Sequence, residues 1–111
     1  MSTPPPVRRG QVWSATTARG LKHTLLIIEA DAAMSAYPLT VVGAVCDTTG
    51  TAPDTLLSAP ISKPVGATVI GTQLHTVTVS FLTSGTYLGI VPAEQMETVS
   101  RAIRLSLDLS D

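Results

Sequence analysis

The chain has 111 residues and a mass of 11.5 kDa, which suits one domain with one core rather than two. Apolar residues make up 44% and charged residues 14%, and the mean hydropathy is +0.34, so a self-association interface is expected to cover part of the apolar surface. The formal net charge of −1 excludes the broad positive field typical of duplex-DNA binders, so any nucleic acid must meet a local patch.

Three features predict a cytoplasmic protein without a membrane segment. The longest aliphatic run, residues 25–28, is far shorter than the roughly 20 residues that a spanning helix needs. The N-terminus lacks the basic start and apolar segment of a secretory signal. Cys46 is the single cysteine, so no intrachain disulfide forms and a reducing compartment is expected.

The predicted elements are mostly short strands. Residues 1–6 are expected to form a flexible Pro-rich tail, and residues 7–111 a single domain. Residues 31–38 suggest a short helical turn or a loop. β-branched and apolar segments separated by turn residues predict strands over residues 11–15, 24–29, 39–46, 55–61, 67–71, 74–81 and 87–91.

The last segment, residues 92–109, changes to a helical period. Met96, Val99, Ile103 and Leu107 recur on one helical face, and Pro92 stands at the entry. Many short strands followed by one amphipathic helix predict a mainly β fold. We expect a small closed or half-closed barrel of about five to seven strands with the helix packed on it.

The residues offer few catalytic signatures, since no phosphate loop, zinc spacing, nucleophile elbow or dinucleotide fingerprint occurs. His23 and His75 are the natural acid–base candidates, although a structural or merely exposed role is the common alternative. No metal site or cofactor is predicted. Cys46 is either an inert core thiol or a nucleophile that needs a neighbouring base. Trp13 suits either base stacking or a place in the barrel core.

The basic residues near the first hairpin also allow two interpretations. Arg8, Arg9, Arg19 and Lys22 either form one positive patch or serve as solubilising surface charge. The remaining pair, Arg101 and Arg104, falls on the helix face opposite the apolar stripe and is expected to be solvated.

The order of segments resembles the MazF/PemK family of toxins over residues 7–109. The family opens with Arg-Gly-Asp/Glu-Val/Ile-Trp, which is similar to residues 9–13, Arg-Gly-Gln-Val-Trp. Its Arg-Pro-Val-Leu-Val-Ile segment is similar to residues 22–27, Lys-His-Thr-Leu-Leu-Ile. Its Gln-Ile-Arg-Thr-Ile/Val segment is similar to residues 73–77, Gln-Leu-His-Thr-Val, and its Leu-Gly before an acidic helix is similar to residues 88–89.

The resemblance implies an SH3-like barrel with a C-terminal helix, a homodimer, and metal-independent cleavage of single-stranded RNA that a cognate MazE-like antitoxin blocks. Family cleavage relies on an arginine at the start of the second strand and a threonine at the end of the third. By position these fall on Lys22, or His23 one residue later, and on Cys46. A lysine lacks the planar fork of a guanidinium and a thiol is a poor donor, so His23 and Thr48 are candidates to supply what is missing.

The resulting hypothesis is a sequence-selective endoribonuclease toxin. Its catalytic residues would be Lys22, His23, Cys46 and Thr48, and its RNA-binding residues would be Arg9, Arg19, Gln73, His75 and Thr76. One alternative is a MazF-like binding protein that has lost cleavage, because both catalytic positions are altered. Another is a gyrase poison like the CcdB toxins, which have a similar barrel.

Overall fold

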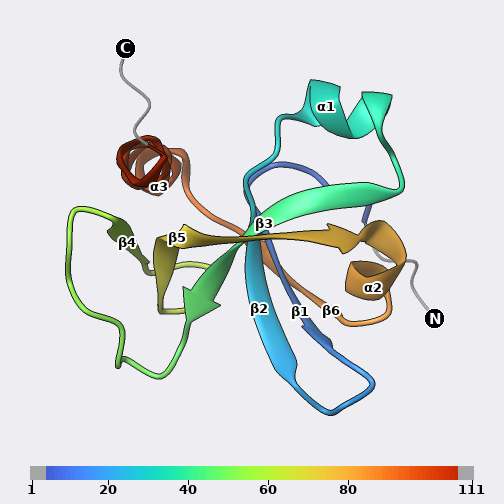
Figure 1. The fold of residues 1–111 in the computed structure, drawn as a ribbon, viewed down its shortest axis with the longest axis horizontal. Helices are drawn as coiled ribbons and strands as arrows, with labels where there is room; N and C mark the ends of the chain where they lie inside the picture. The colour runs from blue at the N-terminus through green and yellow to red at the C-terminus, as the bar shows by residue number, and fades with distance from the viewer. Residues whose placement is uncertain (1–4, 108–111) are drawn as a thin grey trace.

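The computed structural model describes residues 5–107; most of the predicted tail and residues 108–109 of the predicted helix lie outside this range. Six strands and three helices occur within it (Figure 1). In chain order they are β1 (Gln11–Thr16), β2 (Lys22–Ile27), α1 (Asp31–Ala36), β3 (Thr40–Asp47), β4 (Ser58–Ile61), β5 (Ala67–Thr78), α2 (Val79–Thr83), β6 (Thr86–Ile90) and α3 (Ala93–Ser106).

All six strands form one antiparallel sheet in the order β4-β5-β3-β2-β1-β6. The sheet curls into a half-barrel, and the β1–β2 hairpin projects from one end (Figure 1). This architecture confirms the predicted mainly β class, the number of strands and the terminal helix.

The curled sheet has an apolar core on each face because its central strands, residues 24–27 and 41–46, carry continuous apolar runs instead of alternating ones. On one face Leu26, Ala44 and Val69 pack beneath α3, which buries Val99 and Ala102. A second core on the opposite face contains Val7, Trp13, Leu25, Ile27, Met34, Val41 and Leu82.

The predicted face of the terminal helix is largely confirmed. Val99 is buried, and Met96 and Ile103 are partly buried against the first core. Leu107 departs from the prediction: it follows the last helical turn as the C-cap and is 50% exposed. None of the described helices is long and apolar enough to cross a lipid bilayer.

The Arg-Gly-Gln-Val-Trp motif of residues 9–13 has a structural role. Gly10 has φ +91°, a left-handed conformation that favours glycine, and it begins the turn into β1. The buried Gln11 amide accepts hydrogen bonds from Arg8 N (2.8 Å) and Trp13 Nε1 (3.0 Å) and donates to the Pro6 carbonyl (3.0 Å). Trp13 is fully buried 5.2 Å from the Tyr87 ring, so its side chain belongs to the core and not to a surface for base stacking.

The predicted bounds of two strands are wrong. Residues 67–71 and 74–81 were expected to be separate strands, and the second was expected to reach residue 81. They form one strand, β5, which pairs with both β4 and β3 before the junction and with β3 again from Leu74 onward. The strand stops at Thr78, and Val79–Thr83 forms α2 instead. Thr78 caps this helix by accepting a hydrogen bond from Phe81 N (3.1 Å), and this capping overrides the alternating pattern.

Candidate functional site

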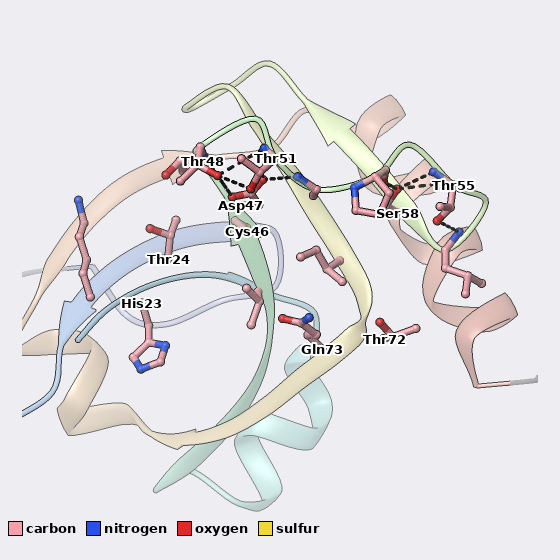
Figure 2. A pocket seen from close by; sticks show the side chains of 17 residues that line it. His23, Thr24, Cys46, Asp47, Thr48, Thr51, Thr55, Ser58, Thr72 and Gln73 are labelled. Atoms are coloured by element: carbon pink, nitrogen blue, oxygen red, sulfur yellow. Dashed lines mark hydrogen bonds between the residues drawn. The ribbon is translucent and has the colours of Figure 1, made fainter.

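A cleft of about 680 Å³ opens where the start of β2, the end of β3 and the middle of β5 converge (Figure 2). We call it the main cleft. The loop between β3 and β4 forms its outer wall, and most of its polar groups are hydroxyls. In chain order it is lined by Lys22, His23, Thr24, Val45, Cys46, Asp47, Thr48, Thr49, Thr51, Ala52, Pro53, Thr55, Leu57, Ser58, Ile70, Thr72 and Gln73.

A break in strand register opens the wall on the β5 side. Ala44 pairs with Leu74, but Cys46 pairs with Val69, so residues 70–73 of β5 stand opposite Val45 alone. Irregular pairing of this kind bends a strand and redirects its side chains, and it is frequent beside functional sites. Here three of these four residues, Ile70, Thr72 and Gln73, line the main cleft.

Lys22 and His23 begin β2 on the opposite wall. Lys22 pairs with Thr16 at the end of the hairpin, is exposed, and has no ion-pair partner within residues 5–107. It is the one lysine or arginine among the residues that line the main cleft. Successive strand residues point to opposite faces, so Lys22 and Thr24 share one face and His23 the other, as Figure 2 shows for His23 and Thr24.

Cys46 reaches the main cleft only as a buried thiol. Its side chain is 5% exposed and belongs to the core beneath α3. Burial raises the pKa of the thiol to about 12, because desolvation of the thiolate outweighs a hydrogen bond from the Leu26 backbone. At neutral pH Cys46 is therefore a neutral thiol, which agrees with the core interpretation and not with a nucleophile.

Asp47, the last residue of β3, organises the loop that walls the main cleft. Its Oδ1 accepts hydrogen bonds from the backbone N (3.1 Å) and Oγ1 (2.6 Å) of Thr49, and its Oδ2 accepts from Thr51 N (3.1 Å) and Ala52 N (2.9 Å) (Figure 2). The Thr49 hydroxyl and these backbone donors lower the pKa of the carboxyl below its ordinary value of 3.8. The ionised carboxylate is thus the form that holds the loop.

We expect the loop to loosen in Asp47→Asn at neutral pH, because the amide nitrogen cannot accept the hydrogen bonds from Thr51 and Ala52. In the wild type the carboxyl pKa is lowered on folding, so its stabilisation is complete above pH 3.8 and is lost as the pH falls through the lowered pKa. Amide hydrogen exchange at Thr51 and Ala52 measures both effects. Asp54→Asn is the matched control, since Asp54 lies in the same loop outside this hydrogen-bond network. Equal exchange rates in wild type and Asp47→Asn would contradict the role of Asp47.

A second cavity, of about 330 Å³, lies on the His23 side of the sheet. We call it the ring pocket because three of its lining side chains, His23, His75 and Phe81, carry rings. The His23 ring centroid lies 6.1 Å from that of His75 and 6.4 Å from that of Phe81. His23 lines both cavities, so the two adjoin at its side chain. The lining residues are Thr17, His23, Leu25, His75, Val77, Thr78 and Phe81.

The structure brings together most of the residues that the sequence selected. Five of the predicted residues, Lys22, His23, Cys46, Thr48 and Gln73, line the main cleft, so positions 22 and 46 do meet at one opening. His75 lines the ring pocket instead. The remaining three predicted RNA-binding residues, Arg9, Arg19 and Thr76, line neither cavity.

The proposed single basic patch is wrong. Arg9 lies before β1, where its guanidinium donates to the Ile28 carbonyl and to Ser100 Oγ (2.9 Å), which ties this turn to α3. Lys22 and Arg19 lie at the other end of the six-residue β1, about 17–20 Å along the strand. The strand therefore separates the two groups of cations, and Arg9 has a local structural role.

The sequence interpretation missed the contribution of the β3–β4 loop and of Phe81. The density of threonines from 48 to 55 is a signal for a hydroxyl-lined wall. The strand expected over residues 74–81 includes Phe81, but Phe81 lies in α2, where its ring is near the histidines. Among the described residues, no group of three or more His, Cys, Asp or Glu side chains could hold a metal ion.

Sequence comparison finds no matching protein-family model and no matching curated protein. Solved structures match closely. An endoribonuclease in complex with its cognate antitoxin, from a Mycobacterial species, has a TM-score of 0.81 at 24% identity, over 95% of this chain and 98% of that chain. A second Mycobacterial endoribonuclease has a TM-score of 0.79 at 25% identity, over 100% and 97%. The Mycobacterium tuberculosis toxin MazF-mt6 has a TM-score of 0.72 at 19% identity, over 91% and 99%. As the sequence resemblance predicted, the chain has the fold of the MazF toxins.

Proposed function

We propose that this chain is the toxin of a toxin–antitoxin pair and acts as a metal-independent endoribonuclease on single-stranded RNA. The observation that carries the proposal is the main cleft, where Lys22 and the residues that follow β3 meet within a MazF-type fold. The two Mycobacterial neighbours are named endoribonucleases, and they cover almost the whole chain.

The reaction that fits the main cleft uses the 2′-hydroxyl of the RNA as the internal nucleophile. The 2′-oxygen bonds to phosphorus as the bond to the 5′-oxygen breaks, one proton leaves the 2′-oxygen and another reaches the 5′-oxygen. The protein then has only to move protons and to stabilise charge on the phosphate. Lys22 is the cation for that charge, and His23 is the proton carrier next to it.

The other selected residues have supporting roles in this mechanism. Thr48 is exposed at the mouth of the main cleft, where its hydroxyl can donate to a phosphate oxygen. Gln73 lies across the main cleft on β5, where its amide can bind the RNA. Cys46 forms part of the wall and takes no part in proton transfer, because its raised pKa keeps the thiol protonated at neutral pH.

The test is incubation of the purified protein with a long single-stranded RNA in buffer containing EDTA. We expect discrete fragments that carry 2′,3′-cyclic phosphate and 5′-hydroxyl ends, and no cleavage of the all-deoxy strand, which lacks the nucleophile. His23→Ala should lower the rate, whereas an uncleaved RNA with the wild-type protein would overturn the proposed activity.

A non-catalytic binding protein remains the second candidate, favoured by the buried thiol of Cys46 at the position where the family has a threonine. It predicts tight binding of RNA or antitoxin without cleavage, and normal growth when the chain is expressed alone. None of the three solved structures named above is a CcdB-type gyrase poison.

The proposed partners follow from the same comparison. One neighbour was solved in complex with its cognate antitoxin, so we expect an antitoxin to bind this chain and to inhibit cleavage. We also expect a homodimer in the cytoplasm, since Leu39 and Leu56 are 80% and 82% exposed and the chain is rich in apolar residues. Light scattering of the purified protein measures the oligomeric state.

A further inference from the structure

The ring pocket shares only His23 with the main cleft, and its other six lining residues have no part in the proposed cleavage chemistry. It lies between β2, β5 and α2, and the aliphatic side chains of Leu25 and Val77 line it. The rings of His23, His75 and Phe81 also line it, with His23 near both of the others. The volume of about 330 Å³ is at the lower end of the range for ligand cavities, roughly 300–1,000 Å³, which suits one small group rather than a length of chain.

The lining of the ring pocket favours a flat, uncharged ligand over a phosphate. No lysine or arginine lines it, so a phosphate placed there would lose its hydration without gaining a cationic partner. A planar heterocycle, in contrast, buries apolar faces against Leu25 and Val77 and stacks or packs edge-on against the three rings.

The two histidines add the capacity to recognise polar edges. The ring nitrogens of His23 and His75 make no hydrogen bond to any residue within 5–107, and His75 is exposed while His23 is half-buried. An imidazole has one donor and one acceptor nitrogen when neutral, which complements the donor and acceptor groups on the edge of a nucleobase.

The ring pocket also adjoins the main cleft at His23, which lines both. A strand whose phosphate lies beside Lys22 can therefore turn an adjacent base to the His23 side of the sheet. We propose that the ring pocket binds one unpaired nucleobase of the RNA strand and holds it beside the phosphate that is cleaved. This proposal rests on the proposed function for the identity of the strand.

The experiment uses the full chain and a short all-deoxy single strand that carries 2-aminopurine at one position, moved along a set of strands. Without the 2′-hydroxyl the strand is not cleaved, so binding and the quenching of 2-aminopurine by stacking are measured alone. We expect quenching at one position of the strand. His75→Ala and Phe81→Leu should weaken binding about 5- to 100-fold and abolish that quenching.

The matched control is Tyr37→Ala, which removes a ring that is 75% exposed and lines neither cavity, and which should bind like the wild type. His75 is exposed, so its replacement leaves the fold intact even if Phe81→Leu does not fold. Unchanged binding and quenching in His75→Ala would overturn the proposal. So would a change of oligomeric state in His75→Ala, because the pocket would then be a contact between subunits.

The outcomes separate this proposal from the proposed function. If the wild-type protein fails to cleave RNA but His75→Ala loses binding of the deoxy strand, the base subsite is supported and the nuclease activity is contradicted. If RNA is cleaved and His75→Ala binds the deoxy strand as tightly as the wild type does, with the quenching intact, the activity is supported and the base subsite is contradicted.

Discussion

Lys22→Ala is expected to lower kcat/KM for cleavage of single-stranded RNA by about 10²- to 10³-fold, the usual effect of removing one group that stabilises transition-state charge. The effect should be this large because Lys22 is the one cation lining the main cleft. Lys22→Arg should retain at least the wild-type rate, since a guanidinium binds phosphate oxygens through two parallel hydrogen bonds. Initial rates on a fluorescent single-stranded RNA measure both variants.

Lys63→Ala is the matched control for Lys22→Ala. Lys63 is exposed in the turn between β4 and β5 and lines neither the main cleft nor the ring pocket, so its loss changes the net charge equally. A comparable loss of rate in Lys63→Ala would mean that Lys22 acts through the overall charge of the protein. Full activity of Lys22→Ala would remove Lys22 from the catalytic site.

Trp13→Ala is expected to lower the free energy of unfolding by about 3–5 kcal/mol, the usual cost of truncating a buried aromatic side chain to alanine. Trp13 has 0% exposure, contacts the Tyr87 ring and donates a hydrogen bond to Gln11. Since a domain of this size has a total stability of about 5–15 kcal/mol, the variant should be close to unfolding. Urea denaturation followed by circular dichroism measures the change.

Two further variants calibrate the result for Trp13. In Trp13→Phe the ring remains but the Nε1 donor is lost, and Gln11 Oε1 still accepts from Arg8 N, so the cost should be well below that of alanine. Tyr37→Ala removes an exposed ring and should leave stability nearly unchanged. A Trp13→Ala protein as stable as the wild type would show that the core of Trp13 and Leu25 does not hold the sheet together.

The sequence predicted the fold well because its signals are local. The apolar runs at residues 25–27 and 41–46 required strands buried on both faces, and the helical period after Pro92 required a helix with one apolar face. Where a local rule competed with another, the prediction failed: the alternating pattern through residues 74–81 was ended at Thr78 by a helix cap.

The candidate site was predicted only in part, because it depends on strands that are distant along the chain. The resemblance at residues 22–27 selected Lys22 and His23, and the main cleft contains both. The resemblance at residues 9–13 selected Arg9, but its guanidinium donates hydrogen bonds to Ile28 and Ser100 at the other end of β1. No sequence pattern indicated that residues 70–73 would leave the ladder with β3, or that Ile70 and Thr72 would line the main cleft.

By itself, the sequence determined which segments become strands, which face of the last helix is buried, and that cationic groups are few. Hydrophobic periodicity, turn residues and helix caps involve residues close together in the sequence, so the sequence alone predicts them. Only the tertiary structure decided that His23, His75 and Phe81 converge, that Cys46 is buried and that Asp47 holds the cleft wall. Those results depend on the curl of the sheet and on a break in register, which are set by packing between residues far apart in sequence.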